Sequence, residues 1–323
     1  MPHSVGGGHG CPPNEPAVRA GYPRGVDVTA VREWYAESKR DLPWRSANVS
    51  AWQVLVSEIM LQQTPVSRVI PAWEAWCSRW PTAQALADAS LGEVLSQWNR
   101  LGYPRRARNL HRTAQIIAAD WNGELPRDVE ALESLPGIGP YTARAVACFA
   151  FGIPVPVVDT NVKRVVARAA DGDEAAGHWT TPFGLARVDE VTGDISAEDY
   201  CDTQRGLMEL GALVCTARSP RCDQCPLIDQ CQWRALGYPA NPSTKPKTQA
   251  TYAGSDRQVR GIILGWLREH PEPLDADDLE SLWPKAVQRR RAVDSLVADG
   301  LIERIESPDG ERFSLSWQPG RGE

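Results

Sequence analysis

The sequence lacks the features that would place a protein in a membrane or outside the cell. No apolar run reaches the ~18 residues that a membrane-spanning helix requires. The first sixteen residues are rich in glycine and proline and contain no apolar core, so they do not resemble a secretory signal. We interpret residues 1–25 as a disordered tail and expect a cytoplasmic protein.

An excess of positive charge is also missing. The formal net charge is −6, which by itself argues against a nucleic-acid partner. The local charge differs, because residues 100–112 contain five arginines and no acid. Such a run is more often a solvated helix face than a site. It can still contact phosphates, since exposed charges are screened beyond about 10 Å.

Neither a β–α–β alternation nor an internal repeat is present, and hydrophobic periodicity indicates helices as far as about residue 232. Ser50 and Asp128 are placed to cap helices, and Gly152 is placed to end one. We therefore expect an all-α fold. The expected helices are 28–38, 51–63, two short ones within 82–100, 104–120, 129–134, 140–151, 160–170 and 197–214.

The C-terminal part has a different pattern. Residues 233–253 are rich in Pro, Ser, Thr and Lys and predict a linker. Three helical stretches then precede two strand-like runs joined at Pro308-Asp309-Gly310. This is the order of a winged-helix domain, so we expect residues 254–318 to form a small winged-helix-like α+β domain. Its Gln288–Arg291 segment suits a groove or phosphate contact, while packing on the catalytic core or binding a protein fits equally well.

Cysteines are not spread as in a small secreted disulfide protein. Four of the eight lie within seventeen residues, at the spacing C-x6-C-x2-C-x5-C: Cys215, Cys222, Cys225 and Cys231. This clustering suits metal binding in a reducing compartment. Four thiolates can hold a zinc ion or an iron–sulfur cluster, and the presence of only one short spacing favours the cluster.

Residues 135–143, LPGIGPYTA, combine two glycines with the start of a helix. Gly137 and Gly139 permit positive φ and close backbone approach, and the free amides of the helix favour a DNA phosphate. An ordinary helix–turn–helix corner would use the same glycines. After a Gly/Pro-rich loop comes Asp159, whose carboxylate could stabilise an oxocarbenium-like sugar, cap the next helix, or do both.

Glu58 belongs to an expected helix with Val54, Leu55 and Leu61 at helical spacing around it. An apolar setting opposes ionisation of a carboxyl group and suits a general acid near neutral pH. A surface glutamate that happens to neighbour leucines is the alternative.

Together, the hairpin, the aspartate and the cysteine loop resemble the endonuclease III superfamily of DNA glycosylases, whose cysteines of this spacing hold a structural or redox-active [4Fe–4S] cluster. Further stretches resemble the A/G-specific adenine DNA glycosylases (the MutY type) over roughly residues 27–232. They are LPWR at 42–45, EIMLQQT at 58–64, LGY at 101–103, RARNLH at 106–111 and MELGALVCT at 208–216.

This resemblance implies a role for each matching residue. Glu58 would protonate the leaving adenine at a ring nitrogen and Asp159 would support the cationic sugar, while Tyr141 and Asn161 position sugar and water. Strand-cutting members carry a lysine at the position of Tyr141, so we expect a monofunctional enzyme. The implied substrate and DNA contacts are Trp44, Arg45 and Glu209 at the flipped adenine, Gln63, Thr64, Leu101 and Tyr103 near the opposing base, and Gly137 and Gly139 at a phosphate.

The resemblance also implies two helical lobes, one of residues 26–46 with 154–232 that carries the cluster and one of 47–153 with the hairpin. The expected partner is double-stranded DNA with adenine opposite 8-oxoguanine or guanine, bound by a nucleoid-associated monomer. The sequence departs from the family at Pro104, at Thr160 and after residue 232, where typical members have a Nudix-like domain. We therefore do not expect a strong preference for 8-oxoguanine over guanine.

Two other functions remain compatible with these motifs. One is a thymine or uracil mismatch glycosylase, because a relative acting on G·T mispairs also carries tyrosine at the Tyr141 position. The other is a non-catalytic iron–sulfur protein that binds DNA through the winged-helix-like tail. The QQT sequence after Glu58 favours adenine over the first, and the combination of Glu58, Tyr141 and Asp159 argues against the second.

Overall fold

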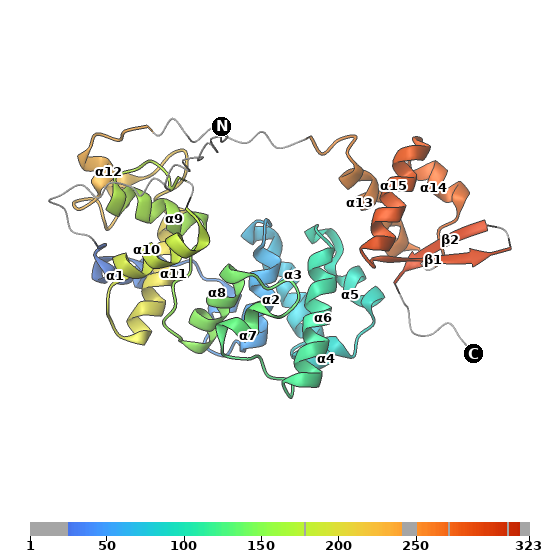
Figure 1. The fold of residues 1–323 in the computed structure, drawn as a ribbon, viewed down its shortest axis with the longest axis horizontal. Coiled ribbons are helices and arrows are strands. Elements are labelled where there is room, and N and C mark those ends of the chain that lie inside the picture. The colour runs from blue at the N-terminus through green and yellow to red at the C-terminus, as the bar shows by residue number, and fades with distance from the viewer. Residues whose placement is uncertain (1–24, 178, 241–250, 271, 309, 317–323) are drawn as a thin grey trace, which may run out of the picture. The chain divides into compact units, whose positions relative to one another are not determined.

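The computed structural model describes residues 25–177, 179–240, 251–270, 272–308 and 310–316 (Figure 1). The expected tail up to residue 24, residues 241–250 of the expected linker and Asp309 of the hairpin turn lie outside the described residues. None of the described helices has the length and hydrophobicity needed to cross a bilayer. The chain divides into two compact units, one of residues 1–37, 158–195 and 206–244 and one of 38–157, 196–205 and 245–323.

The first unit is helical and packs around small aliphatic side chains. Val162, Val188 and Leu207 are completely buried at its centre. A Cβ atom on Gly211 would lie 2.7 Å from the Cβ of Asn161, so a glycine is needed for the two helices to approach. The elements of this unit are α1 (Val28–Ser38), α9 (Thr160–Val166), the π-helical turn η3 (Ala167–Asp171), α10 (Thr181–Thr192), the second half of α11 (Ala197–Leu213), η4 (Cys222–Gln224) and α12 (Gln232–Ala235).

The second unit begins with a helical part whose core is rich in tryptophan. The ring of Trp76 is fully buried and meets those of Trp80 and Trp98 edge-on, at 4.7 and 5.5 Å between centroids. The elements are η1 (Pro43–Arg45), α2 (Ala51–Leu61), α3 (Val66–Arg79), α4 (Ala83–Ala87), α5 (Leu91–Trp98), η2 (Asn99–Leu101), α6 (Arg105–Asp120), α7 (Val129–Glu133) and α8 (Pro140–Phe151).

Local capping explains most helix boundaries. Ser50 accepts a hydrogen bond from the Gln53 amide at 3.3 Å, and the Gln53 side chain accepts one from the Ser50 amide at 2.9 Å, which fixes the start of α2. Gly152 ends α8 in the left-handed conformation, as expected. The expected end of α2 at residue 63 is wrong, because Gln63 has a φ of 57° and the helix stops at Leu61.

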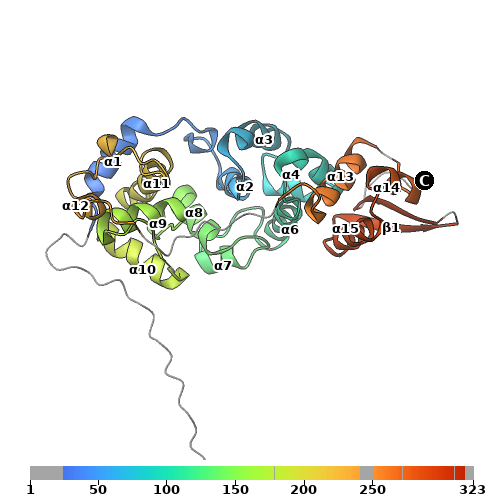
Figure 2. The ribbon, with the colours of Figure 1, turned by 90° about the horizontal axis from the view of Figure 1, so that it is seen from above.

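The C-terminal residues of the second unit form three helices and a hairpin: α13 (Asp256–Glu269), α14 (Ala276–Leu282), α15 (Ala286–Ala298), β1 (Ile302–Ser307) and β2 (Gly310–Leu315). The strands pair antiparallel with Ile302 opposite Leu315 and Ser307 opposite Gly310. These elements lie next to α5 and α6 in both ribbon views (Figures 1 and 2), and their buried side chains belong to the same core. The mostly helical fold with a small C-terminal hairpin confirms the expected fold class.

Candidate functional site

Glu58 lies on the buried side of α2, in the second unit. Its exposure is 7%, and the neighbouring Leu55 and Ile59 are almost fully buried. Helix α2 packs against α6 and α8, which leaves Glu58 in an interior position rather than on an open helix face. The burial that the sequence pattern indicated for Glu58 is therefore present.

The four residues expected near the opposing base lie on two neighbouring loops of the second unit. Gln63 and Tyr103 are exposed, and each has the positive φ that side-chain-bearing residues rarely adopt, 57° and 49°. Thr64 and Leu101 are buried behind them, and the Thr64 hydroxyl donates to the Leu101 carbonyl at 3.4 Å. Backbone strain of this kind is typical of functional loops.

Arg106 joins these two loops. The sequence placed it in a basic run and in the RARNLH stretch, without a role of its own. Its guanidinium donates to the Gln62 carbonyl at 2.6 Å and the Thr64 hydroxyl at 3.0 Å on one side. On the other side it reaches the Leu101 and Gly102 carbonyls at 3.2 and 3.1 Å. These acceptors are neutral, and burial lowers the pKa of Arg106 to about 10. No local sequence signal reveals this role, since the partners lie up to 47 residues away.

Residues expected at the flipped adenine differ in their surroundings. Trp44 is 8% exposed and packs edge-on against Trp73 at 5.9 Å, so its ring is part of the core. The neighbouring Arg45 donates to the Arg40 carbonyl at 3.2 Å. Glu209, on α11 in the first unit, is completely buried. Tyr141 is half-buried in the first turn of α8.

The glycine hairpin connects α7 to α8 and uses its two glycines differently. Gly137 has a φ of 80°, and a Cβ there would lie 2.9 Å from the Cβ of Asn109, so only glycine fits. Gly139 does not use the positive φ that glycine permits, because its φ is −100° and it caps the amino end of α8 in an extended conformation. A Cβ at Gly139 would meet nothing within 4 Å, which leaves the backbone at this helix end open to a ligand.

Asp159 caps the amino end of α9 in the first unit. One carboxylate oxygen accepts from the Val162 amide at 2.7 Å, and the other accepts from the Asn161 side-chain amide at 2.7 Å. Burial raises the pKa of Asp159, and these two hydrogen bonds oppose the rise. The expected capping role is present, and the hydrogen bonds fix the orientation of the carboxylate.

Arg164 holds Asn161 in place and was not singled out in the sequence. Its guanidinium donates to the Asn161 side-chain oxygen and to the Gly211 carbonyl, both at 2.7 Å. It also donates to the Cys215 carbonyl at 2.7 Å. A continuous set of hydrogen bonds thus runs from the first cysteine of the loop through Arg164 and Asn161 to the Asp159 carboxylate.

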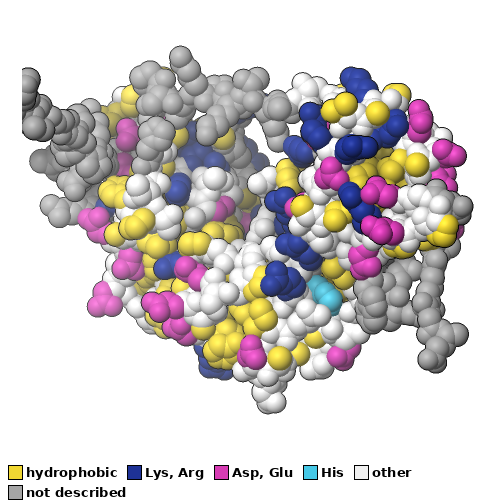
Figure 3. Space-filling model, turned by 45° about the vertical axis from the view of Figure 1, so that its right-hand side comes forward, with side chains coloured by type: hydrophobic (Ala, Val, Ile, Leu, Met, Phe, Trp, Pro, Cys, Tyr) yellow, Lys and Arg dark blue, Asp and Glu magenta, His cyan; other side chains and the backbone are white. Residues whose placement is uncertain are grey.

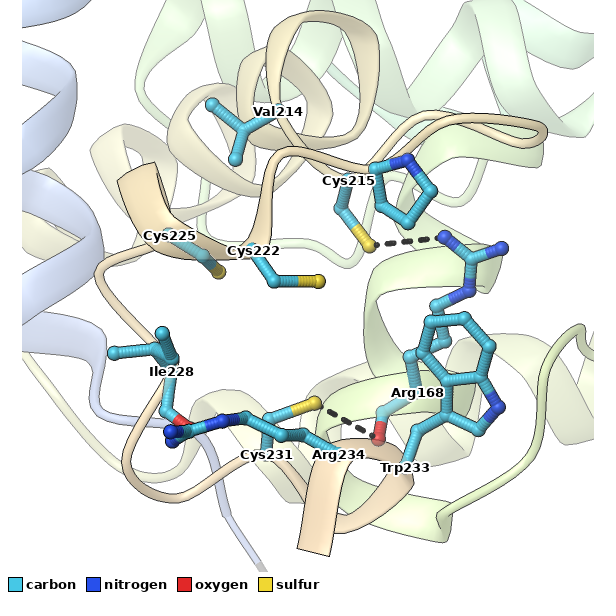
Figure 4. Close-up of a pocket in the computed structure, with 10 residues that line it drawn as sticks. Arg168, Val214, Cys215, Cys222, Cys225, Ile228, Cys231, Trp233 and Arg234 are labelled. Carbon is cyan, nitrogen blue, oxygen red and sulfur yellow. Dashed lines mark hydrogen bonds between the residues drawn. The ribbon is translucent and has the colours of Figure 1, made fainter. Parts of the chain in front are cut away.

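The four clustered cysteines line one pocket in the first unit. Figure 4 shows Cys215, Cys222, Cys225 and Cys231 directing their sulfur atoms into the same space. Arg168 borders the cavity and braces the loop, with its Nη1 3.5 Å from the Cys215 sulfur and 2.8 Å from the Thr216 carbonyl. Its guanidinium also lies 4.4 Å from the ring centroid of Trp233.

The chemistry of this cavity fits an iron–sulfur cluster. Burial and the charges of the other three thiolates raise the pKa of Cys225 to about 12, so four thiolates need a cationic group between them. A [4Fe–4S] cluster spreads four thiolates over several irons, and the four cysteines that line this pocket supply that donor set.

Comparison with known proteins supports the same assignment. Residues 215–231 match the iron–sulfur binding domain of endonuclease III, and residues 56–177 match the HhH-GPD superfamily of base excision DNA repair proteins. The cysteine loop binds a [4Fe–4S] cluster. A solved thermostable thymine-DNA glycosylase superimposes with a TM-score of 0.57 at 25% identity, over 65% of this chain and 95% of its own. A trapped endonuclease III–DNA covalent intermediate has the same fold, with a TM-score of 0.56 at 23% identity, over 66% and 95%.

Two similar proteins match almost end to end. An adenine DNA glycosylase of Mycolicibacterium smegmatis is 52% identical over 92% of this chain and 98% of its own length. The adenine DNA glycosylase of Mycobacterium tuberculosis strain H37Rv is 50% identical over 95% and 98%. With the buried Glu58, the oriented Asp159 and the cluster loop all present, the chain belongs to the adenine DNA glycosylase family of the HhH-GPD base excision DNA repair superfamily.

Proposed function

We propose that this protein is a monofunctional glycosylase that hydrolyses the N-glycosidic bond of adenine placed opposite 8-oxoguanine or guanine in double-stranded DNA. The observation that carries the proposal is the Asp159 carboxylate, which two hydrogen bonds orient at the end of α9. A second acid, Glu58, is buried on α2 with Leu55 and Ile59 buried beside it along the helix, and a buried carboxyl group suits a proton donor near neutral pH.

In the proposed reaction both acids act on one extruded nucleotide. Glu58 donates a proton to a ring nitrogen of adenine as the bond between C1′ and the base breaks. The ionised Asp159 stabilises the oxocarbenium-like sugar. Water then adds its hydroxyl to C1′, and its remaining proton replaces the one that Glu58 gave up. Tyr141 and Asn161 position the sugar and this water.

The product is an abasic site in an intact strand. Tyr141 occupies the position where strand-cutting relatives carry a lysine, and a phenol cannot form the imine that leads to strand cleavage. The base-release step and the strand break can therefore be separated in one assay.

The DNA contacts follow from the exposed and strained positions. Gln63 and Tyr103 would enter the space left in the base stack, supported by Thr64 and Leu101 behind them. Gly137 and Gly139 would bring the amides of α8 to a phosphate. Trp44, Arg45 and Glu209 would form the surroundings of the adenine. Trp44 and Glu209 are buried and Arg45 is half-buried, so they would act from within their own units rather than by reaching out from the surface.

We propose that two lobes contact the duplex, one formed by residues 26–46 with 154–232 and the other by residues 47–153. We also propose that the protein binds DNA as a monomer associated with the nucleoid. The first unit supplies Asp159 and the cluster, and the second supplies Glu58 and the hairpin.

A panel of end-labelled duplexes tests the proposal. The cluster-loaded protein is incubated with A opposite 8-oxoguanine, A opposite guanine, T opposite guanine and fully matched DNA, and each sample is split with and without alkali. We expect adenine-dependent breaks only after alkali, with 8-oxoguanine and guanine both accepted. Breaks at G·T alone would instead support a thymine glycosylase, as in the structurally similar thermostable thymine-DNA glycosylase. Binding without any break would support a non-catalytic protein.

A further inference from the structure

The C-terminal elements are fastened to α6 through one buried aspartate. Asp299 is 7% exposed, and its two carboxylate oxygens accept from Arg105 and Arg260, each at 2.5 Å. Its carbonyl oxygen accepts from Arg108. Strand β2 lies against α5 on the same side. The arginine run of α6 therefore holds the C-terminal elements, rather than forming a free cationic face.

We call the two loops that carry Gln63 and Tyr103 the wedge loops. Because its arginines hold the C-terminal elements, α6 offers few cations to the wedge loops. Arg106 is buried between the loops, while Arg105 and Arg108 are engaged with Asp299. Arg112 is exposed, but it lies more than a turn further along the helix. The charge of Arg68, on α3, reaches Arg106 and lowers its pKa. The exposed cation that contacts Tyr103 itself comes from α13.

Arg257, in the first turn of α13, supplies that cation. Its guanidinium lies 5.3 Å from the ring centroid of Tyr103, and its Nη2 lies 3.3 Å from the Tyr103 hydroxyl. The buried Arg106 is 5.4 Å from the same ring, so Tyr103 contacts one interior and one exposed guanidinium. The C-terminal elements thus reach the residue expected to enter the base stack.

The charge of Arg257 is available to a ligand. Its neighbour Asp256 is occupied by Gln288 and Arg291 of α15, each at 2.9 Å. No carboxylate among the described residues forms an ion pair with Arg257. Figure 3 shows Lys and Arg side chains, with Asp and Glu among them, on the surface of the second unit. Most of these arginines on the C-terminal elements are paired with carboxylates, and Arg257 is an exposed one that is not, within the described part of the chain. An exposed, unpaired guanidinium beside Tyr103 suits a phosphate of the DNA backbone.

Helix α15, the third helix of the C-terminal elements, offers fewer free side chains for a DNA contact. Gln288 is buried and bonds to the Gly254 carbonyl and Asp256, and Arg289 donates to the Trp283 carbonyl. Arg290 and Arg291 are both exposed, but Arg291 is paired with Asp256, whereas Arg290 has no partner among the described residues. The expected groove contact by Gln288–Arg291 would therefore rest on Arg290. A DNA contact through Arg290 of α15 is the alternative to one through Arg257 of α13.

We propose that the C-terminal elements extend the DNA-binding surface at the wedge, where Arg257 binds a backbone phosphate beside the base opposite the adenine and keeps Tyr103 aligned. The inference rests on the proposed function for the role of Tyr103 alone. It assigns a DNA contact to the region where typical family members carry a Nudix-like domain, and it places that contact on α13 rather than on α15.

The test measures DNA affinity of the full, cluster-loaded protein with an uncleavable probe. The probe is a duplex carrying a tetrahydrofuran abasic analogue opposite guanine, titrated over a range of salt concentrations. We expect Arg257→Ala to weaken binding about fivefold to tenfold and to reduce the slope of log affinity against log salt by about 1. Arg304→Ala is the matched control, since Arg304 is an arginine of β1 already paired with Asp294 and Glu311.

Three outcomes decide the matter. A loss of affinity and slope with Arg257→Ala, but not with Arg304→Ala, supports the proposal. Wild-type affinity and slope in Arg257→Ala overturn it, and so does a loss confined to Arg290→Ala, which would place the DNA contact on α15. Adenine release by the wild-type preparation is measured in parallel. A wild type that releases no adenine refutes the proposed function, whereas an active wild type with an unaffected Arg257→Ala variant refutes only this inference.

Discussion

At the scale of single residues, the wedge loops show how much depends on one buried arginine. Gln63 and Tyr103 both adopt positive φ, a conformation that costs roughly 1–3 kcal/mol for a residue with a side chain. Arg106 offsets this cost by binding the carbonyls that both loops turn inward. In the sequence, Arg106 belongs to the arginine run and to the RARNLH stretch, and neither indicates its role. Several of its acceptors lie more than forty residues away along the chain.

Replacing Arg106 with methionine should destabilise the protein and loosen both loops. Several buried carbonyls would lose their donor, which costs about 3 kcal/mol or more. Arg112→Met removes an exposed arginine of the same helix and should change the free energy of unfolding by less than about 0.5 kcal/mol. Denaturant unfolding of the two variants measures the difference. Equal stabilities would contradict the role assigned to Arg106.

At the scale of elements, hydrogen bonds connect α9 and the cysteine loop to the Asp159 carboxylate. The first turn of α9 presents Asp159 and Asn161, its second presents Arg164, and Arg164 reaches the Cys215 carbonyl. The positive charge of Arg164 lowers the pKa of Asp159, while burial raises it more strongly. Only the ionised form can stabilise a cationic sugar, so activity should fall as the pH drops through this raised pKa.

Arg164→Met should shift that acidic limb to higher pH. Without the guanidinium, no positive charge from Arg164 opposes the effect of burial, so the pKa of Asp159 rises further. As the pH falls, Asp159 then becomes protonated at a higher pH than in the wild type. The plateau rate should fall as well, because Asn161 loses its fixed orientation. Single-turnover adenine release across a pH series measures both effects. Lys163→Met removes a neighbouring charge and serves as the control. If the acidic limb of the pH profile stays in place or moves to lower pH in Arg164→Met, the role assigned to Arg164 is refuted.

The helical elements differ in how far the sequence reveals them. Those with a polar cap at the start, such as α2 with Ser50 and α7 with Asp128, could be located from the sequence within two residues. Helices α3 and α10 escaped detection. Pro71 lies inside α3 and Gly184 lies inside α10, and both residue types disfavour a helix interior, so tertiary packing overrides the local signal there. Pro182 lies in the first turn of α10, where proline is compatible with a helix.

At the scale of the whole molecule, the C-terminal elements share a hydrophobic core with α5 and α6. Val259, Leu301 and Leu315 are almost fully buried in it. The sequence indicated a linker and a separate pattern, but no local feature could show that Asp299 would meet arginines nearly two hundred residues earlier. Deleting residues 250–323 would expose this core, so point substitutions are the sharper test of its role.

The motifs for chemistry were easier to predict than their supports. Glu58, Asp159 and the four cysteines stand out because each falls within a short, specific pattern. Arg106, Arg164 and Arg168 do not, because a buried arginine that binds carbonyls has the same local sequence context as one in water. The surrounding fold, and not the local sequence, decides which arginine becomes structural.

The central claim is that one acid from each unit acts on the same adenine. Single-turnover release from a duplex with adenine opposite 8-oxoguanine tests it most directly, with Glu58→Gln and Asp159→Asn compared with wild type at saturating protein. Asparagine can still accept from the Val162 amide, so the cap of α9 survives the second change. We expect each variant to bind the mispair and to lose about 100-fold or more in rate. Near-wild-type release by either variant would contradict the account.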